Sequence, residues 1–207
     1  MYSIKEIYKT IQGEGAQSGR VAIFVRFSGC NLWSGREKHR ASAICQFCDT
    51  DFVGTNGING GTYSETDLLK KINELWGDAK NKFIVFTGGE PMLQLDQNLI
   101  KECKKNDFTT AVETNGTIAI DCDIDWICVS PKHGSELIVK NGNELKVVYP
   151  QSGQNLARFL DLKFDYKFLQ PMDGLNAKDN LDQTIKYCIK NPVWSLSLQT
   201  HKLIGMA

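Results

Sequence analysis

The sequence lacks an excess of charge of either sign. Its 207 residues hold 24 Lys and Arg against 24 Asp and Glu, so the formal net charge is zero. Sequence-independent binding to nucleic acid or to an anionic membrane needs an excess of cations. We therefore expect neither nucleic acid nor a membrane surface as a partner.

Long apolar runs are also missing. No stretch approaches the roughly 18 consecutive apolar residues that a membrane helix needs. Residues 1–12 include Lys5, Glu6 and Lys9 and have no apolar centre of the signal-peptide type. These features predict a cytoplasmic protein. The composition, 42% hydrophobic and 23% charged, is that of a globular chain, and the length suits one domain over residues 1–207.

Strand-like and helical segments alternate along the chain. Strands are predicted at residues 21–28, 83–87, 108–113, 126–130, 144–149, 166–170 and 194–199. Helices are predicted at residues 65–76, 95–105, 155–162 and 177–189, and residues 29–62 form a long polar loop. Such alternation predicts a mostly parallel α/β sheet, and the length falls short of the ~250 residues of a closed eight-stranded barrel. We expect an incomplete (β/α) barrel.

Polar or glycine-rich segments follow five of the predicted strands. Because ligands of parallel α/β folds bind at the carboxyl ends of the strands, these segments are expected to surround one site. Any one of them alone is equally well explained as a turn. The segments are Gly29-Cys30, Gly88-Gly89-Glu90, Glu113-Thr114-Asn115, Ser130-Pro131-Lys132 and Gln170-Pro171-Met172-Asp173.

The chain has seven cysteines, an odd number. In a reducing compartment, cysteines are free, metal-bound or catalytic more often than paired. Four of them lie among ordinary strand or helix residues and are interpreted as small buried hydrophobes: Cys103, Cys122, Cys128 and Cys188.

The other three, Cys30, Cys45 and Cys48, form a pattern that suits a metal centre. Fourteen residues separate the first pair and two separate the second. Three thiolates without a fourth suit an iron–sulfur cluster with one open iron. Zinc with a fourth ligand from His39 or Asp49 fits the spacing as well, and a redox Cys-x-x-Cys pair is a third option. Spacing alone leaves all three open.

Motifs along nearly the whole chain resemble those of one family. They are Gln12–Gly15, Arg26–Trp33, Cys45–Thr50, Gly88–Pro91, Glu113–Gly116, Ser130–Lys132 and Gln170–Asp173. Together they resemble the 7-carboxy-7-deazaguanine synthases of the radical S-adenosylmethionine superfamily. The long first cysteine spacing departs from the three residues usual in that superfamily and matches a subset of the family. The resemblance implies the superfamily's incomplete barrel, with a cluster-binding insert at about residues 29–62.

The resemblance also implies the reaction. 6-Carboxy-5,6,7,8-tetrahydropterin is contracted to 7-carboxy-7-deazaguanine with loss of ammonia, a carbon–nitrogen lyase step of queuosine-type 7-deazapurine biosynthesis. A 4Fe–4S cluster and S-adenosylmethionine supply the radical, and Mg²⁺ assists. Implied partners are the pterin, a flavodoxin or ferredoxin as reductant, and a second copy in a homodimer. Two rival interpretations are a glycyl-radical activase and a zinc-binding module without catalysis.

Site residues are carried over from the family by motif position. Cluster ligands are Cys30, Cys45 and Cys48, and Thr50 is the Mg²⁺ ligand. Glu90 either accepts from the ammonium of S-adenosylmethionine or fixes its own loop. The full set implied for S-adenosylmethionine is Phe47, Cys48, Asp49, Gly89, Glu90, Asn115, Ser130, Pro131, Lys132, Gln170, Pro171, Met172 and Asp173.

The substrate side is implied in the same way. Arg26, a strand residue amid apolar neighbours, suits a bidentate pair with the pterin carboxylate. Glu14, Glu113 and His201 are the implied catalytic groups. Further substrate contacts are Ile11, Gln12, Gly13, Glu14, Thr87 and the terminal carboxylate of Ala207. The tail before Ala207 holds Leu203, Ile204 and Met206, and this apolar character predicts that it docks across the barrel mouth.

Overall fold

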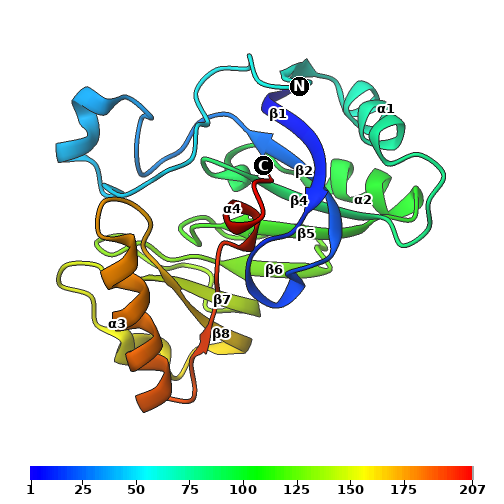
Figure 1. The fold of residues 1–207 in the computed structure, drawn as a ribbon. Helices are drawn as coiled ribbons and strands as arrows, with labels where there is room; N and C mark the ends of the chain where they lie inside the picture. Colours follow the sequence, from blue (N-terminus) through cyan, green and yellow to red (C-terminus); the bar gives the residue numbers. More distant parts are fainter. Residues whose placement is uncertain (207) are drawn as a thin grey trace.

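A computed structural model describes residues 1–206, which build one curved, open nine-stranded sheet (Figure 1). The strand order is β3-β1-β2-β4-β5-β6-β7-β8-β9. From β2 to β9 neighbouring strands are parallel, whereas β1 pairs antiparallel with both β2 and β3. The bounds are β1 (Tyr2–Ile11), β2 (Val21–Phe27), β3 (Gly61–Tyr63), β4 (Phe83–Gly88), β5 (Thr109–Thr114), β6 (Trp126–Val129), β7 (Asn141–Tyr149), β8 (Lys163–Pro171) and β9 (Ser195–Leu196).

Four α-helices accompany the sheet in the described part of the chain. They are α1 (Glu65–Trp76), α2 (Gln97–Lys105), α3 (Ala177–Lys190) and the one-turn α4 (Thr200–Leu203). Short 3₁₀ turns lie at Gly15–Gln17, Glu37–Ser42, Pro91–Leu93 and Leu156–Phe159. None of the helices within residues 1–206 is long and apolar enough to cross a membrane.

The two helices beside the first half of the sheet begin at polar caps. The Ser64 hydroxyl accepts from the Asp67 N–H at 3.1 Å, and Asp96 accepts from Asn98 and Leu99 at 3.0 Å. α1 then buries Leu68, Ile72 and Trp76, one residue per turn, against β1 and β2.

Alternation along each strand separates the core from the barrel interior. On β7, Leu145 and Val147 pack into one of the two hydrophobic clusters, whereas Lys146 and Val148 face a central cavity. Residues of α1, α2, β1, β2, β4 and β5 make the other cluster. The cavity therefore lies on the side of the strands opposite to the helices, as in a barrel.

Five features differ from the sequence-based expectations, and one is β3, whose first two residues fall inside the loop predicted at residues 29–62. β1 was not predicted, because a bulge between Ile4 and Glu6 buries Lys5 and breaks the two-residue alternation. No helix connects β5 to β6 or β6 to β7 among the described residues, and the helix predicted at 155–162 is a 3₁₀ turn. The last predicted strand keeps only Ser195–Leu196, because Ser197 turns inward and hydrogen-bonds Gly15 and Gln170.

Candidate active site

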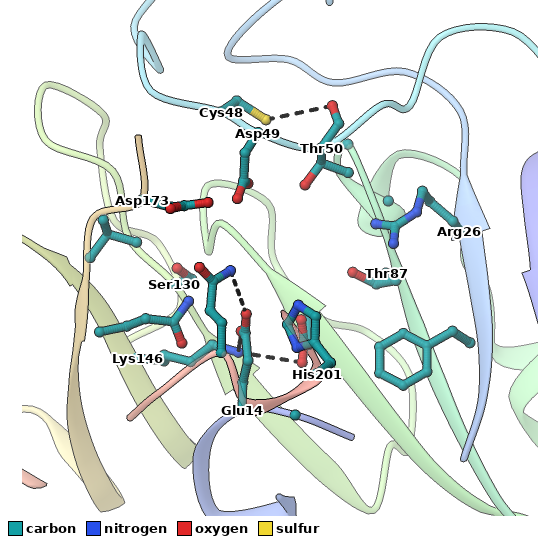
Figure 2. Close-up of a pocket in the computed structure, with 18 of the residues that line it drawn as sticks. Glu14, Arg26, Cys48, Asp49, Thr50, Thr87, Ser130, Lys146, Asp173 and His201 are labelled. Carbon is teal, nitrogen blue, oxygen red and sulfur yellow. Dashed lines mark hydrogen bonds and ion pairs between the residues drawn. The ribbon is translucent and has the colours of Figure 1, made fainter. Parts of the chain in front are cut away.

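A cavity of about 400 Å³ opens at the carboxyl ends of the parallel strands, within the size range of small-molecule sites (Figure 2). Four of the five polar segments that follow predicted strands contribute lining residues. The fifth, Gly29-Cys30, lies directly behind, where its Gly29 carbonyl accepts from the Glu90 N–H at 2.9 Å. The segments thus surround one site, as their positions after the strands predicted.

The cysteine loop forms one rim of this cavity. Cys45 and Cys48 line it, with their thiols close enough to interact. Interaction with Cys48, together with burial, raises the pKa of Cys45, and interaction with Cys45 lowers the pKa of Cys48 to about 6. Burial raises the pKa of Cys30, whose sulfur accepts from the Leu32 N–H at 3.4 Å. The pair therefore offers one thiolate near neutral pH.

These thiols fit an iron–sulfur cluster by their chemistry. All three are free, and Cys30 lies so close to Gly89 that a Cβ on that glycine would come within 2.8 Å of the Cys30 Cβ. Across residues 1–206, no three His, Cys, Asp or Glu side chains converge on a single-ion site. A four-iron cluster binds each thiolate through a different iron, so its ligands need not converge on one point.

Arg40, in the insert before the second cysteine, holds this loop in shape. Its guanidinium donates to the carbonyl oxygens of Gln46 and Cys48 at 3.0 and 3.1 Å. The same group lies 4.0 Å from the centre of the Trp33 ring and pairs with Glu37. The sequence offered no signal for this role, because an arginine in a charged 3₁₀ turn is typical of a solvated surface.

Glu90 fixes its own loop and does not face the cavity. It is completely buried and accepts from the Met92 N–H at 3.0 Å, the Thr114 hydroxyl at 2.7 Å and the Asn115 N–H at 2.7 Å. Of its two predicted roles, this geometry favours the fixing of the loop. Pro131 is likewise buried outside the lining of the cavity.

The other residues predicted to bind S-adenosylmethionine line the cavity between the cysteine loop and β8. Lys132 donates to the Ser130 carbonyl and hydroxyl oxygens at 2.9 and 2.8 Å and lies 5.9 Å from the centre of the Phe47 ring. The remaining members are Cys48, Asp49, Gly89, Asn115, Gln170, Pro171, Met172 and Asp173.

Lys202, from α4, ties two of these segments together. Its ammonium pairs with Asp49 of the cysteine loop at 2.7 Å and with Asp173 after β8. Figure 2 shows Asp49 and Asp173 facing each other across the upper part of the cavity. Hydrogen bonding to Lys202 lowers the pKa of Asp173. A C-terminal residue that the sequence analysis did not assign therefore closes one side of the cofactor region.

Arg26 lies on the opposite wall, at the end of β2. Its Nε donates to Glu6 at 2.8 Å and one Nη donates to the Tyr8 hydroxyl at 2.9 Å, while the other Nη has no partner in residues 1–206. Thr87 is its neighbour in register on β4, and Thr50 lines the same part of the cavity. Arg26 thus presents a partly used guanidinium to a ligand.

Two glutamates and a buried lysine form the floor. The Lys146 ammonium pairs with Glu14 at 2.6 Å and with Glu113 at 3.4 Å. Gln12 donates to Glu113 at 2.9 Å and Gln199 donates to Glu14 at 3.0 Å. Burial raises the pKa of Glu14, but the charge and hydrogen bond of Lys146 outweigh it and leave a pKa of about 2.

The turn that carries Glu14 packs directly against α4. Thr200 donates through its N–H and its hydroxyl to the Gly13 carbonyl at 2.9 and 2.8 Å. A Cβ on Gly13 would lie 2.2 Å from His201 Nδ1, so this approach requires glycine. His201 therefore lies beside Glu14 in the cavity, together with Ile11 (Figure 2).

The residues after β9 do not dock through their apolar side chains, as the sequence predicted. Thr200 and His201 contact the turn at Gly13, whereas Leu203 and Ile204 are 75% and 59% exposed. Because α4 is a single turn, its outer side chains find no sheet face to cover. Ala207, whose carboxylate was predicted to contact substrate, lies outside the described residues 1–206.

Several lining residues escaped the sequence analysis. Glu6 and Tyr8 belong to the unpredicted β1, and Gln199 follows the end of β9. Lys146 belongs to a predicted strand, where charged and apolar residues alternate as Glu144-Leu145-Lys146-Val147. That alternation could have indicated that Glu144 and Lys146 share one face of the strand, but such a face is usually exposed to solvent. In this barrel the charged face points inward.

Comparisons with known proteins agree with this geometry. The sequence model of the radical SAM superfamily matches residues 39–185. 7-Carboxy-7-deazaguanine synthase from Bordetella pertussis is 52% identical over 207 residues, and that from Burkholderia multivorans is 53% identical over 208; each alignment covers 99% of both chains. The crystal structure of QueE from Escherichia coli matches with a TM-score of 0.69 at 27% identity, covering 95% of this chain and 93% of the other.

Proposed function

Because the chain belongs to the 7-carboxy-7-deazaguanine synthases of the radical SAM superfamily, we propose that the cavity at the strand ends is divided between a cofactor rim and a substrate floor. The protein is a radical SAM carbon–nitrogen lyase of queuosine-type biosynthesis, which contracts a carboxylated tetrahydropterin to 7-carboxy-7-deazaguanine with release of ammonia. One observation carries the proposed division. The cysteine loop and the Arg26–Glu14–His201 wall face the same cavity from opposite sides (Figure 2).

On the cofactor rim, Cys30, Cys45 and Cys48 would hold the 4Fe–4S cluster. When bound, the cluster and S-adenosylmethionine supply the electron and the organic radical that begin the reaction. Lys132 and the Asp49–Lys202–Asp173 bridge border the space next to the cysteine loop, where they would orient the charged ends of S-adenosylmethionine. The glycines at positions 88 and 89 let their own loop approach the β2 end, because a Cβ would lie 2.3 Å from the Phe27 carbonyl oxygen or 2.1 Å from that of Gly29.

On the substrate floor, Arg26 would bind the pterin carboxylate through the Nη that has no partner in the described chain. Glu6 partly neutralises Arg26, so a further cation near the same carboxylate is favourable. Thr50 offers a hard oxygen ligand there, which supports Mg²⁺ as a third cofactor.

Both floor carboxylates would accept hydrogen bonds from the substrate, and Glu113 would have a second role in proton transfer. Each oxygen of Glu14 accepts one hydrogen bond and can accept a second, and a pKa of about 2 keeps the group ionised, so Glu14 acts as an acceptor for substrate N–H groups. Glu113 Oε2 has no partner in residues 1–206, which leaves Glu113 and His201 as the groups for proton transfer. This assignment narrows the three catalytic residues expected from the sequence to two.

The exposed surface of the protein supports two protein partners, a reductant and a second copy of the chain. We propose a flavodoxin or ferredoxin as reductant, since the cysteine loop lies at the surface with Gln46 and Asp49 exposed. The exposed apolar side chains of Ile185 and Ile189 on α3 support a homodimer. Seven free thiols, three of them needed by the cluster, suit a reducing cytoplasm.

The direct test is conversion of the pterin by anaerobically reconstituted protein with S-adenosylmethionine and dithionite. We expect 7-carboxy-7-deazaguanine and ammonia in equal amounts, measured by mass spectrometry and an ammonia assay. Cys48→Ala is expected to abolish iron loading and product, whereas Cys103→Ala, which removes a thiol of the helix core, keeps both. A wild-type protein that carries the cluster and cleaves S-adenosylmethionine but forms no product contradicts the proposed substrate.

A further inference from the structure

Lys146 is buried in the centre of the barrel, with 5% of its side chain exposed. Its aliphatic chain belongs to β7, between Leu145 and Val147 of the hydrophobic core. Figure 2 shows its ammonium on the floor of the cavity beside Glu14. A lysine is almost never fully buried unless it is paired, because desolvation of its charge is costly. This position therefore needs an explanation beyond packing.

The groups around Lys146 come from every element that forms the floor. Glu14 and Glu113 pair with it from the turn after β1 and from β5. Glu144 lies two residues earlier on β7 and accepts from the Ala16 N–H at 3.1 Å. The Cys128 thiol of β6 completes the surroundings of Lys146, and His201 of α4 acts on Glu14. Two carboxylates thus share one ammonium, and a third, Glu144, lies within its electrostatic reach. Without the ammonium the carboxylates would repel one another.

The hydrogen bonds of Lys146 also determine which oxygens a ligand meets. Glu113 Oε1 accepts from both Gln12 and Lys146, so Oε2 is left toward the cavity. Glu14 is fixed between Lys146 and Gln199. Lys146 bonds both carboxylates directly, whereas Gln12 links the turn to Glu113 through its own side-chain amide.

We propose that Lys146 is a positioning residue for substrate recognition, which holds the carboxylates of Glu14 and Glu113 side by side to accept the N–H donors of an amino-pyrimidinone edge. The inference rests on the proposed substrate floor and deepens it. Adjacent carboxylate oxygens select a ligand edge with neighbouring N–H groups, because a ligand without them leaves buried acceptors unpaired. The site therefore prefers a 2-amino pterin over an analogue that carries oxygen at the same position.

The test compares Lys146→Met with Lys146→Arg and a matched control. Lys104→Met removes another lysine that pairs with two carboxylates, Asp123 and Asp125, far from the cavity on α2. Calorimetry on cluster-loaded protein measures the affinity for 6-carboxytetrahydropterin and for its 2-oxo analogue. We expect Lys146→Met to weaken pterin binding about 10- to 100-fold and to reduce the preference over the analogue. Lys146→Arg restores most of the affinity, and Lys104→Met binds as wild type does.

Two further readouts separate positioning from a general structural role. Iron content and uncoupled cleavage of S-adenosylmethionine are expected to stay unchanged in Lys146→Met. Its pterin affinity recovers as the pH rises from 6 to 8, because burial without the ammonium raises the pKa of Glu14 and protonates it at the lower pH. Wild type has no such dependence from Glu14, whose pKa is about 2. His201 lies beside Glu14 in both wild type and Lys146→Met, so its own effect on pterin affinity is common to both. The readout is therefore the difference between their two profiles of pterin affinity against pH.

The outcomes are distinct. Wild-type affinity and wild-type preference in Lys146→Met overturn the role of Lys146 alone. Absence of pterin binding by cluster-loaded wild type overturns the substrate floor itself. Should Lys146→Met not fold, Glu14→Gln/Lys146→Met removes both partners and leaves fewer unpaired charges. Because Lys146 still holds Glu113 when Glu14 is replaced, the double variant is expected to bind pterin more weakly than Glu14→Gln, and equal affinities of the two overturn the proposal.

Discussion

At the scale of single residues, polar side chains at the cavity differ in how many of their hydrogen-bond donors and acceptors are already bonded to other protein groups. Glu90 uses its carboxylate on three internal donors and shapes a loop. Arg26 uses only part of its guanidinium, on Glu6 and Tyr8. A polar group with unused capacity inside a cavity is available to a ligand, whereas a satisfied one is part of the frame. This criterion separates binding residues from supporting residues of the same type.

Arg26 gives the first prediction at this scale. Arg26→Ala is expected to weaken pterin binding at least 30-fold, because it removes the cation and leaves Glu6 to repel the pterin carboxylate. Arg26→Lys keeps the charge but loses the planar fork, so it recovers only part of the affinity. Calorimetry on cluster-loaded protein measures both.

The control for Arg26 is Arg158→Ala, which removes an exposed arginine beside Phe159. It is expected to bind pterin as wild type does. All three variants should cleave S-adenosylmethionine at the wild-type uncoupled rate. Unchanged pterin affinity in Arg26→Ala would show that another group binds the carboxylate.

At the scale of elements, the two ends of the described chain meet over the cavity. The turn after β1 carries Gln12 and Glu14, and α4 carries His201 and Lys202. Thr200 and the missing side chain of Gly13 bring these elements into contact. Neither element is stable alone, since one is a turn and the other a single helical turn. Each therefore positions the other.

This contact predicts a steric effect of Gly13→Ala. The added Cβ would overlap His201 Nδ1 and lie 2.7 Å from the His201 backbone nitrogen, so α4 must move. We expect pterin affinity to fall about tenfold or more, the equivalent of ~1.4 kcal/mol, while iron content stays unchanged. Calorimetry and an iron assay on the same preparation test this.

Gly61→Ala is the matched control, because a Cβ there meets only the flexible ring of Tyr63 at 3.2 Å on the edge strand β3. It should retain wild-type affinity for pterin. Equal affinities of the two variants would mean that α4 does not shape the substrate floor.

At the scale of the whole molecule, the hydrophobic cores and the cysteine loop are separate. The two buried clusters join the strands to α1, α2 and the 3₁₀ turn Leu156–Phe159. The loop of residues 29–62 has its own small contact, in which Trp33 packs edge-on against Phe52 at 5.6 Å. Sheet stability should therefore depend little on the metal centre.

The corresponding prediction concerns cluster removal. Protein stripped of iron by chelation is expected to keep its far-UV circular dichroism and a cooperative thermal transition, because both cores remain intact. Amide hydrogen exchange should increase mainly within residues 29–56, because residues 57–62 are hydrogen-bonded to β1, and binding of S-adenosylmethionine should be lost. Loss of protection throughout β4 and β5 would show that the cluster is needed for the fold.

Local patterns in the sequence were sufficient to predict the parallel strands, the N-terminal cap of α1, and the polar segments at the strand ends. These features depend on neighbours within a few residues, and the strand ends converge because parallel strands share one edge. The family motifs were equally local. They predicted the reaction, with which the named relatives agree, and the cysteine ligands, which stay a prediction. β1 escaped because its bulge at Lys5 interrupts the alternation on which strand prediction depends.

Only the tertiary structure decided which charged residues face inward. Glu144 and Lys146 alternate with apolar neighbours in a way that fits a solvated strand face equally well, and the curvature of the sheet turns that face into the barrel. Contacts between distant segments could not be predicted from the sequence either. Examples are the contacts of Lys146 with Glu14, Lys202 with Asp49, and His201 with Gly13. Such contacts depend on the relative placement of elements more than 100 residues apart, which no local pattern encodes.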